Sequence, residues 1–157
     1  MVDNTSNKGM TPIVQTIAGW IKGIIFLFGL YIILFGHLTP GGGFAGGVIL
    51  ALVYVLITLS NGSEASLRKM PLNVAGELDS VGALMFPVIA WLGIGSILGG
   101  RFFINYIARY NPGIPFHLFS AGTIPLNNIA IALKVGASLF LVFMILVMAK
   151  VVHKPSE

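Results

Sequence analysis

The sequence predicts an all-α integral membrane protein with four transmembrane helices, and two observations carry that prediction. Of 157 residues, 56% are hydrophobic and only 9% are charged, whereas soluble domains carry about 25% charged residues. In addition, no Asp, Glu, Lys or Arg occurs between Lys22 and Glu64. A membrane-spanning helix needs about 20 apolar residues. This stretch alone therefore has room for two crossings.

The first two spans are predicted to form a hairpin around a glycine-rich hinge. The first span covers about residues 11–35, with Pro12 in its first turn, where a missing N–H costs nothing. The second covers about residues 42–60. Between them lies HLTPGGGFAGG, from His37 to Gly47, in which Pro40 stops the first helix and the glycines permit a sharp turn.

The middle of the chain is predicted to hold a solvent-facing loop and the third span. Residues 61–76 are polar and contain Pro71 as a breaker. The third span follows at about residues 77–98. Pro87 lies inside it and predicts a kink, because a proline removes one backbone hydrogen bond of the helix.

Two further helices complete a single four-helix transmembrane domain over 1–157. Aromatic residues recur at helical spacing in 101–110, which predicts a short helix lying in the headgroup region. The fourth span begins near Thr123 as N-cap and covers about residues 123–152.

Basic residues predict the orientation of the chain in the cell membrane. Four spans put both termini and the 61–76 loop on one side, and the hinge with the aromatic segment on the other. The first side carries more Lys and Arg, so the positive-inside rule places both termini in the cytoplasm. The residues compared are Lys8, Arg68, Lys69, Lys150 and Lys154 against Arg101 and Arg109. The net charge of +4 therefore indicates topology and not a nucleic-acid partner.

Lys134 is the leading candidate for an intramembrane charge. It lies nine positions after Pro125, which places it roughly 14 Å into the bilayer core. Asn127 and Ser138 fall on the same helix face at i−7 and i+4, giving a polar stripe. One interpretation is an intramembrane proton or ion relay, since charges in membranes mark ion paths. The other is a lysine paired to a neighbouring subunit's carboxylate to fix assembly.

Three further residues are candidates for the ion path, each with a structural alternative. Glu77 and Asp79 are acids near a membrane entrance, where they would gather cations or simply be stabilised by a helix dipole. His37 would either shuttle protons or cap carbonyls at a helix end. For Lys22, near Trp20, the pattern favours an interfacial lysine that snorkels outward.

The hinge glycines are predicted to pack helices closely. Gly42 with Gly46, and Gly43 with Gly47, form two small-xxx-small pairs at the head of the second span. A broken-helix ion site with exposed carbonyls is the alternative. The proposed packing hinge comprises Pro40, Gly41, Gly42, Gly43, Phe44, Gly46 and Gly47.

The sequence predicts no metal site, no cofactor and no active site in this chain. There is no cysteine, which excludes thiolate metal sites and iron–sulfur ligands. His117 and His153 have no partner at metal-ligand spacing. No combination of nucleophile, base and orienting group can be assembled, so the chain alone is not expected to be an enzyme.

The run from Gly36 to Gly47, GHLTPGGGFAGG, closely resembles the pattern of the B subunit (MnhB or MrpB) of Mrp-type multisubunit Na⁺/H⁺ antiporters. The last helix of bacterial B subunits typically contains the motif F-D-x-G-V. The corresponding residues 133–137 here are LKVGA, so Lys134 stands where that motif has an acid. The stretch SAGTIPLNNIAIALKVGA, residues 120–137, looks more like the B-type subunits within archaeal membrane-bound hydrogenase and related sulfur-reducing complexes.

That resemblance implies a non-catalytic membrane subunit of a Na⁺ and H⁺ translocating module. Its partners would be other Mrp-like membrane subunits and hydrogenase or sulfur-reductase subunits, which would hold the NiFe and iron–sulfur clusters and couple ferredoxin oxidation to ion pumping. The alternatives are a subunit of a free-standing Mrp antiporter, a purely structural scaffold, and an independent small exporter or channel.

Overall fold

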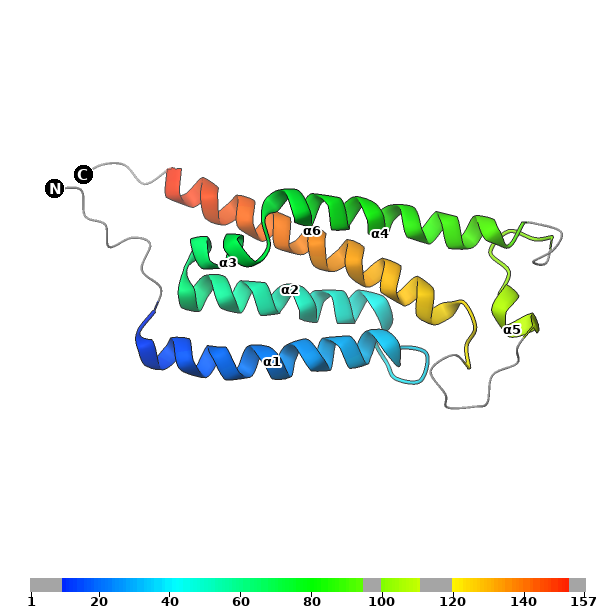
Figure 1. Cartoon of the computed structure of the whole chain (residues 1–157), viewed down its shortest axis with the longest axis horizontal. Coiled ribbons are helices and arrows are strands. Elements are labelled where there is room, and N and C mark those ends of the chain that lie inside the picture. Colours follow the sequence, from blue (N-terminus) through cyan, green and yellow to red (C-terminus); the bar gives the residue numbers. More distant parts are fainter. Residues whose placement is uncertain (1–9, 95–99, 111–119, 153–157) are drawn as a thin grey trace.

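The computed structural model describes residues 10–94, 100–110 and 120–152, and within these ranges every regular element is a helix (Figure 1). Four helices are long and apolar enough to cross a membrane, which confirms the predicted fold class. They are α1 (Pro12–Leu34), α2 (Gly42–Asn61), α4 (Leu72–Leu92) and α6 (Ile124–Val152). Two short helices, α3 (Ser63–Lys69) and α5 (Tyr106–Tyr110), lie between them in the chain.

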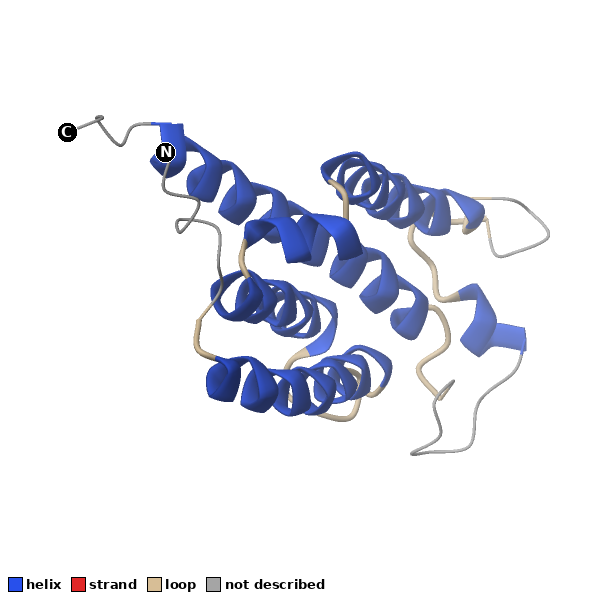
Figure 2. Cartoon of the chain, turned by 60° about the vertical axis from the view of Figure 1, so that its left-hand side comes forward, coloured by secondary structure: helices blue, strands red, loops and turns tan. Residues whose placement is uncertain are grey.

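The long helices form a row in the order α1, α2, α6, α4. The extensive contacts are those of α1 with α2, α2 with α6, and α6 with α4, while α1 touches α6 only slightly. Figure 2 shows α2 and α6 in the middle of this row. The start of α1 and the end of α6 lie at the same end of the molecule as α3, and the α1–α2 turn and α5 lie toward the other (Figure 1).

The hinge joins α1 to α2 by a turn that needs glycine. Gly42 has a φ of +78°, a conformation that residues with a side chain rarely adopt. Gly43 and Gly47 then face α6: a Cβ on Gly43 would collide with the carbonyl oxygen of Asn128, and one on Gly47 would lie 2.9 Å from that of Ala132. The backbones of α2 and α6 are therefore in direct contact.

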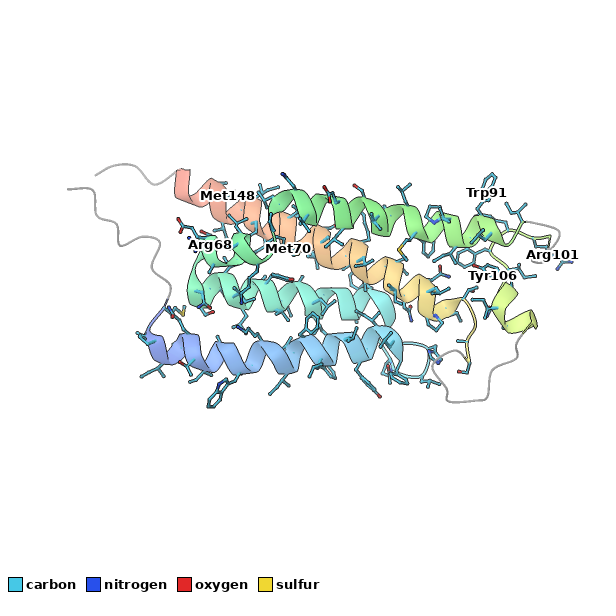
Figure 3. The ribbon with its side chains drawn as sticks, viewed as in Figure 1. Arg68, Met70, Trp91, Arg101, Tyr106 and Met148 are labelled. Atoms are coloured by element: carbon cyan, nitrogen blue, oxygen red, sulfur yellow. The ribbon has the colours of Figure 1, made fainter. Side chains whose placement is uncertain are left out.

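The segment 61–76 is not a solvent-facing loop, and this prediction was wrong. It contains α3 and the first turn of α4, which starts at Leu72 and not at Glu77. Met70 and Ala75 are buried in a cluster with Phe140 and Met144 of α6. Apolar side chains at helical spacing outweigh the polar ones, and Pro71 precedes the helix start, where its missing N–H is harmless. Figure 3 shows Arg68 and Met70 toward the end of the molecule at which α3 lies.

The predicted helix over 101–110 is only half formed, because its first part caps α4 instead. Backbone N–H groups of Arg101 and Phe103 donate to the carbonyls of Gly93 and Ala90 at 3.1 Å. These bonds satisfy carbonyls that a helix end leaves unpaired. Phe103 has a φ of +60°, so only Tyr106–Tyr110 is helical. The end of α4 lies at Leu92, and residues 95–98 of the predicted third span are outside the described residues.

Candidate functional site

A cluster of three polar side chains lies between α4 and α6, deep along both helices. Asp79 comes seven residues after the start of α4 and Lys134 ten after the start of α6. At 1.5 Å per residue these positions lie about 10 Å and about 15 Å along their helices. Both α4 and α6 are candidate membrane spans. The cluster therefore occupies a depth at which charged groups are costly and uncommon.

The geometry of the cluster is that of an ion pair with an added hydroxyl. Lys134 Nζ donates to Asp79 Oδ1 at 2.7 Å and to Oδ2 at 2.6 Å. The hydroxyl of Ser138 also donates to Asp79 Oδ1. Lys134 and Ser138 are one helical turn apart, so both reach the same carboxylate. Opposite charges at this distance compensate one another, which lowers the cost of placing either in a membrane.

A close approach of the two helices allows the short side chain of Asp79 to reach α6. A Cβ placed on Gly82 would lie 2.6 Å from the backbone nitrogen of Lys134 and 2.9 Å from the carbonyl oxygen of Ala130. Gly82 follows Asp79 by three residues and so lies on the same face of α4. The glycine therefore brings α4 against α6 at the level of the ion pair.

The ion pair is not sealed within the chain. The side chain of Lys134 is 45% exposed and that of Asp79 is 24% exposed. A pocket of about 290 Å³ lies beside it, lined by Gly82, Ala83, Phe86, Ile131 and Lys134. The charged cluster therefore borders the outer face of α4 and α6, where lipid, water or another subunit would contact it.

Three predicted ion-path residues do not join this cluster, and one of them, His37, lies in the turn between α1 and α2. Asn127 is buried, but within the described residues no hydrogen bond links it to Lys134, and its Oδ1 has no partner there. Glu77 is exposed on α4 and is not hydrogen-bonded to the cluster. The polar stripe predicted on α6 is therefore reduced to Lys134 and Ser138, with Asp79 completing it from α4.

The alternative interpretations of Lys134 and Asp79 both change. The carboxylate that pairs with Lys134 belongs to this chain, so another subunit is not needed to supply it. Asp79 lies in the interior of α4 because the helix begins at Leu72, and so it is not a first-turn residue stabilised by the helix dipole. A helix start placed at Leu72 in the sequence would have put Asp79 at the depth of Lys134.

The hinge glycines at positions 42, 43, 46 and 47 are buried, whereas Pro40, Gly41 and Phe44 are exposed, Phe44 to 65%. Pro40 and Gly41 lie in the turn before α2. A Cβ on Gly46 would collide with the side chain of Ile33 on α1. His37 lies in the same turn, and its Nε2 is 3.2 Å from the hydroxyl of Ser120, just before α6. The turn is thus tied to the start of α6.

Sequence reasoning missed Asn105, which organises the approach to α6. Its Oδ1 accepts hydrogen bonds from the backbone N–H of Thr123 at 3.0 Å and of Ala108 at 3.3 Å. Its Nδ2 donates to the carbonyl of Ala121 at 2.8 Å. Asn105 therefore satisfies donors near the starts of both α5 and α6, a role that short polar side chains often take. Its position within an aromatic segment concealed that role.

Among the described residues, no group of three or more His, Cys, Asp or Glu side chains could hold a metal ion. His117 and His153, which the sequence analysis did not assign as metal ligands, lie outside the described residues, as do Lys8 and Lys154. The chemistry open to the site is that of an amine, a carboxylate and a hydroxyl. These groups can bind and exchange protons and can place oxygen atoms toward a cation.

Four apolar helices with an ion pair between two of them define a multi-pass membrane protein. Residues 13–141 match the family described as a domain related to the MnhB subunit of Na⁺/H⁺ antiporters. The chain belongs to this family, and the resemblance carried by the hinge is confirmed. The matched residues include the hinge, Asp79, Lys134 and Ser138.

Relatives and a solved structure agree with this assignment. The chain is 33% identical over 132 residues to an uncharacterized protein of Methanocaldococcus jannaschii, covering 82% of this chain and 49% of that protein. It is 35% identical over 101 residues to the B subunit of the Na⁺/H⁺ antiporter of Bacillus subtilis, covering 62% of this chain and 66% of that relative. The chain thus spans about half to two thirds of these relatives.

The fold also matches a chain in the solved structure of the membrane-bound sulfane sulfur reductase, an archaeal respiratory membrane complex. The TM-score is 0.72 with 24% sequence identity, covering 90% of this chain and 62% of that one. At this identity the likeness establishes the fold of the membrane helices.

Proposed function

We propose that this chain is a non-catalytic membrane subunit of an Mrp-type Na⁺/H⁺ translocating module within a respiratory complex of the hydrogenase or sulfur-reducing type. Membership of the MnhB-related family and the fold shared with a sulfane sulfur reductase chain support this proposal. NiFe or iron–sulfur chemistry would belong to partner subunits. The chain would lie in the plasma membrane with both termini in the cytoplasm, as the distribution of basic residues favours.

The observation that carries the proposal is the ion pair of Lys134 and Asp79 on the outer face of α4 and α6. A carboxylate held between an ammonium and a hydroxyl can take up or release a proton as its partners shift. Because the side chain of Lys134 is 45% exposed, a molecule that lies against this face of α4 and α6 would touch the ion pair. Since hydrocarbon is a poor neighbour for an ammonium, a neighbouring subunit or a water-filled path would cover this face.

The decisive experiment removes both charges at once in the assembled complex. Lys134→Met with Asp79→Leu leaves no unpaired charge, and such replacements are often neutral for stability. We expect the complex to assemble with this double variant and its Na⁺-dependent proton transport in liposomes to fall by at least about a hundredfold, the low end of what general acid–base groups contribute. Glu77→Gln, on the same helix but outside the cluster, is the matched control and should transport normally.

A structural scaffold is the second candidate function, and one observation favours it. Because both charges belong to one chain, the pair would hold α4 against α6 without moving any ion. This candidate predicts that the double variant transports at the wild-type rate. That result would overturn the ion-path role while leaving family membership untouched.

The choice between a respiratory complex and a free-standing antiporter depends on the partners. Purification in mild detergent through a tag on this chain would recover hydrogen-evolving or sulfur-reducing activity if the chain belongs to a respiratory complex. Recovery of Mrp-type membrane subunits without redox activity would identify the free-standing antiporter instead. Transport by this chain alone in liposomes would identify an independent exporter.

A further inference from the structure

Pro87 lies inside α4, and its effect on the helix falls beside the ion pair. A proline has no backbone N–H, so the carbonyl oxygen four residues earlier loses its helical hydrogen bond. That oxygen belongs to Ala83, which lines the pocket of about 290 Å³ next to Lys134. Among the described residues that line this pocket, Lys134 alone has a side chain that can donate a hydrogen bond. Inside a membrane, a carbonyl freed by proline needs a donor from a neighbouring group.

The pocket lies on the opposite side of Lys134 from Asp79. Asp79 is bonded by Ser138, whereas Gly82, three residues further along α4, lies against the backbone of Lys134, four residues earlier on α6. The two helices are therefore antiparallel, and the pocket extends further in the same direction. Its other lining residues are Ala83, Phe86 and Ile131. Lys134 thus stands between the carboxylate on one side and the pocket on the other.

The side chain of Lys134 has an acceptor in each direction. Its backbone nitrogen would lie 2.6 Å from a Cβ placed on Gly82, so Asp79 comes three residues before this level of α4 and Ala83 one residue after it. Long side chains of a helix lean toward the N-terminus of that helix. For Lys134 this direction leads into the pocket and away from Asp79. The side chain is also 45% exposed, so packing does not fix it.

A second acceptor without a partner lies beyond the pocket. Asn127 comes seven residues before Lys134, which places it two helical turns away on the same face of α6. It is 9% exposed, and its Oδ1 has no hydrogen-bond partner among the described residues. Buried polar atoms are normally hydrogen-bonded. The open acceptors on this side of Lys134 therefore favour a position of its ammonium nearer to them.

We propose that Pro87 is a positioning residue, which gives the ammonium of Lys134 a second position at the carbonyl oxygen of Ala83. When the ammonium moves there, Asp79 keeps only the hydroxyl of Ser138, and its carboxylate takes up a proton from water at the exposed face. Return of the ammonium sends that proton back to water. The inference rests on the proposed function for its role in transport, and it adds the residue that lets the ion pair open.

The first test follows the lysine and not transport. The full-length chain in detergent is labelled with ¹⁵N-lysine, and the Nζ signal of Lys134 is the one that Lys134→Met removes. Pro87→Ala restores the N–H that bonds the carbonyl of Ala83, so we expect the signal to shift toward that of a fixed ion pair. Pro71→Ala precedes α4, restores no hydrogen bond within it and should leave the signal unchanged. An identical Lys134 signal in the Pro87→Ala and wild-type chains would overturn the proposal.

The second test measures transport by the assembled complex. We expect Pro87→Ala to assemble, to transport at least about tenfold more slowly and to show a displaced pH profile, because one hydrogen bond to a charged group changes an equilibrium by about that factor. Adding Ile131→Gln, which places an amide oxygen in the pocket, should restore much of the rate. Wild-type rate and pH profile in Pro87→Ala would overturn the positioning role.

The two tests separate this inference from the proposed function. If Lys134→Met with Asp79→Leu transports normally, the proposed function fails, and the Nζ signal still decides whether Lys134 has a second position. If that double variant loses transport while the Nζ signal ignores Pro87→Ala, the proposed function stands and the second position is overturned.

Discussion

Helix α6 is held on its two sides by contacts of opposite kinds. Against the first turns of α2 the contact is close backbone packing at Gly43 and Gly47, and further along α2 the ring of Tyr54 packs on that of Phe140. Against α4 the contact combines one close approach at Gly82 with the ion pair of Lys134 and Asp79. Helix α2 contains no Asp, Glu, His, Lys or Arg, whereas the contact with α4 contains two charged groups.

The glycine contact with α2 specifies how the helices pack, whereas the contact with α4 holds the groups that could react with protons or bind ions. A glycine contact tolerates no enlargement, since any added atom meets backbone that cannot move aside. An ion pair tolerates substitution of both members but not of one, because the remaining charge is left uncompensated. The hinge pattern that marks the family therefore lies in the packing contact, and the groups able to handle ions lie on the other side of α6.

The largest effect is expected from Gly43→Leu, which fills the packing contact. Its Cβ alone would collide with the carbonyl oxygen of Asn128, so α2 and α6 must separate. We expect a loss of at least about 3 kcal/mol of stability, above the usual range for overpacking because the obstacle is backbone. Thermal unfolding of the full chain in detergent and its recovery in the complex measure the effect.

Gly19→Leu is the matched control for that substitution. Gly19 lies on α1, and a Cβ placed there would meet nothing within 4 Å. The same change of residue should therefore alter stability by no more than about 1 kcal/mol, the gain in helix propensity. Equal losses of stability in Gly43→Leu and Gly19→Leu would show that the α2–α6 contact does not restrict residue size more than the surface of α1 does.

The next effect is expected from Lys134→Met alone, which breaks the second contact. Asp79 would keep its charge without a cation, and we expect a loss of about 3 kcal/mol, the low end for a broken buried pair because the side chains are partly exposed. Adding Asp79→Leu should restore most of this stability. A double variant as unstable as the single one would mean that the pair provides packing and not charge compensation.

The sequence predicted the two contacts unequally, for a physical reason. The glycine pairs at positions 42, 43, 46 and 47 follow a local spacing rule, so their role can be read from one helix. The ion pair joins residues 55 positions apart, and its detection required the correct start of α4. The polar residues of 61–76 concealed that start, since Met70 and Ala75 are buried in a cluster with Phe140 and Met144 of α6, which are far away in the sequence.

A smaller effect is expected from Ser138→Ala. This change removes the hydroxyl that donates to Asp79 but leaves the ion pair in place. We expect a loss of about 1.5 kcal/mol, the contribution of a hydrogen bond to a charged group. Transport in the complex should change in its pH dependence, because the carboxylate loses one of its donors. An unchanged pH profile would count against a role of Asp79 in proton transfer.

The smallest effect tests whether the hinge has any chemistry of its own. His37 bonds to Ser120 across 3.2 Å, which ties the turn to the start of α6. His37→Leu should cost about 1 kcal/mol, the value of one hydrogen bond, while His37→Gln should retain most of it. Histidine is the side chain that titrates near neutral pH. If the hinge serves packing alone, the complex with His37→Gln transports with the wild-type pH profile. A displaced pH profile would show that proton transfer involves the hinge as well as the ion pair between α4 and α6.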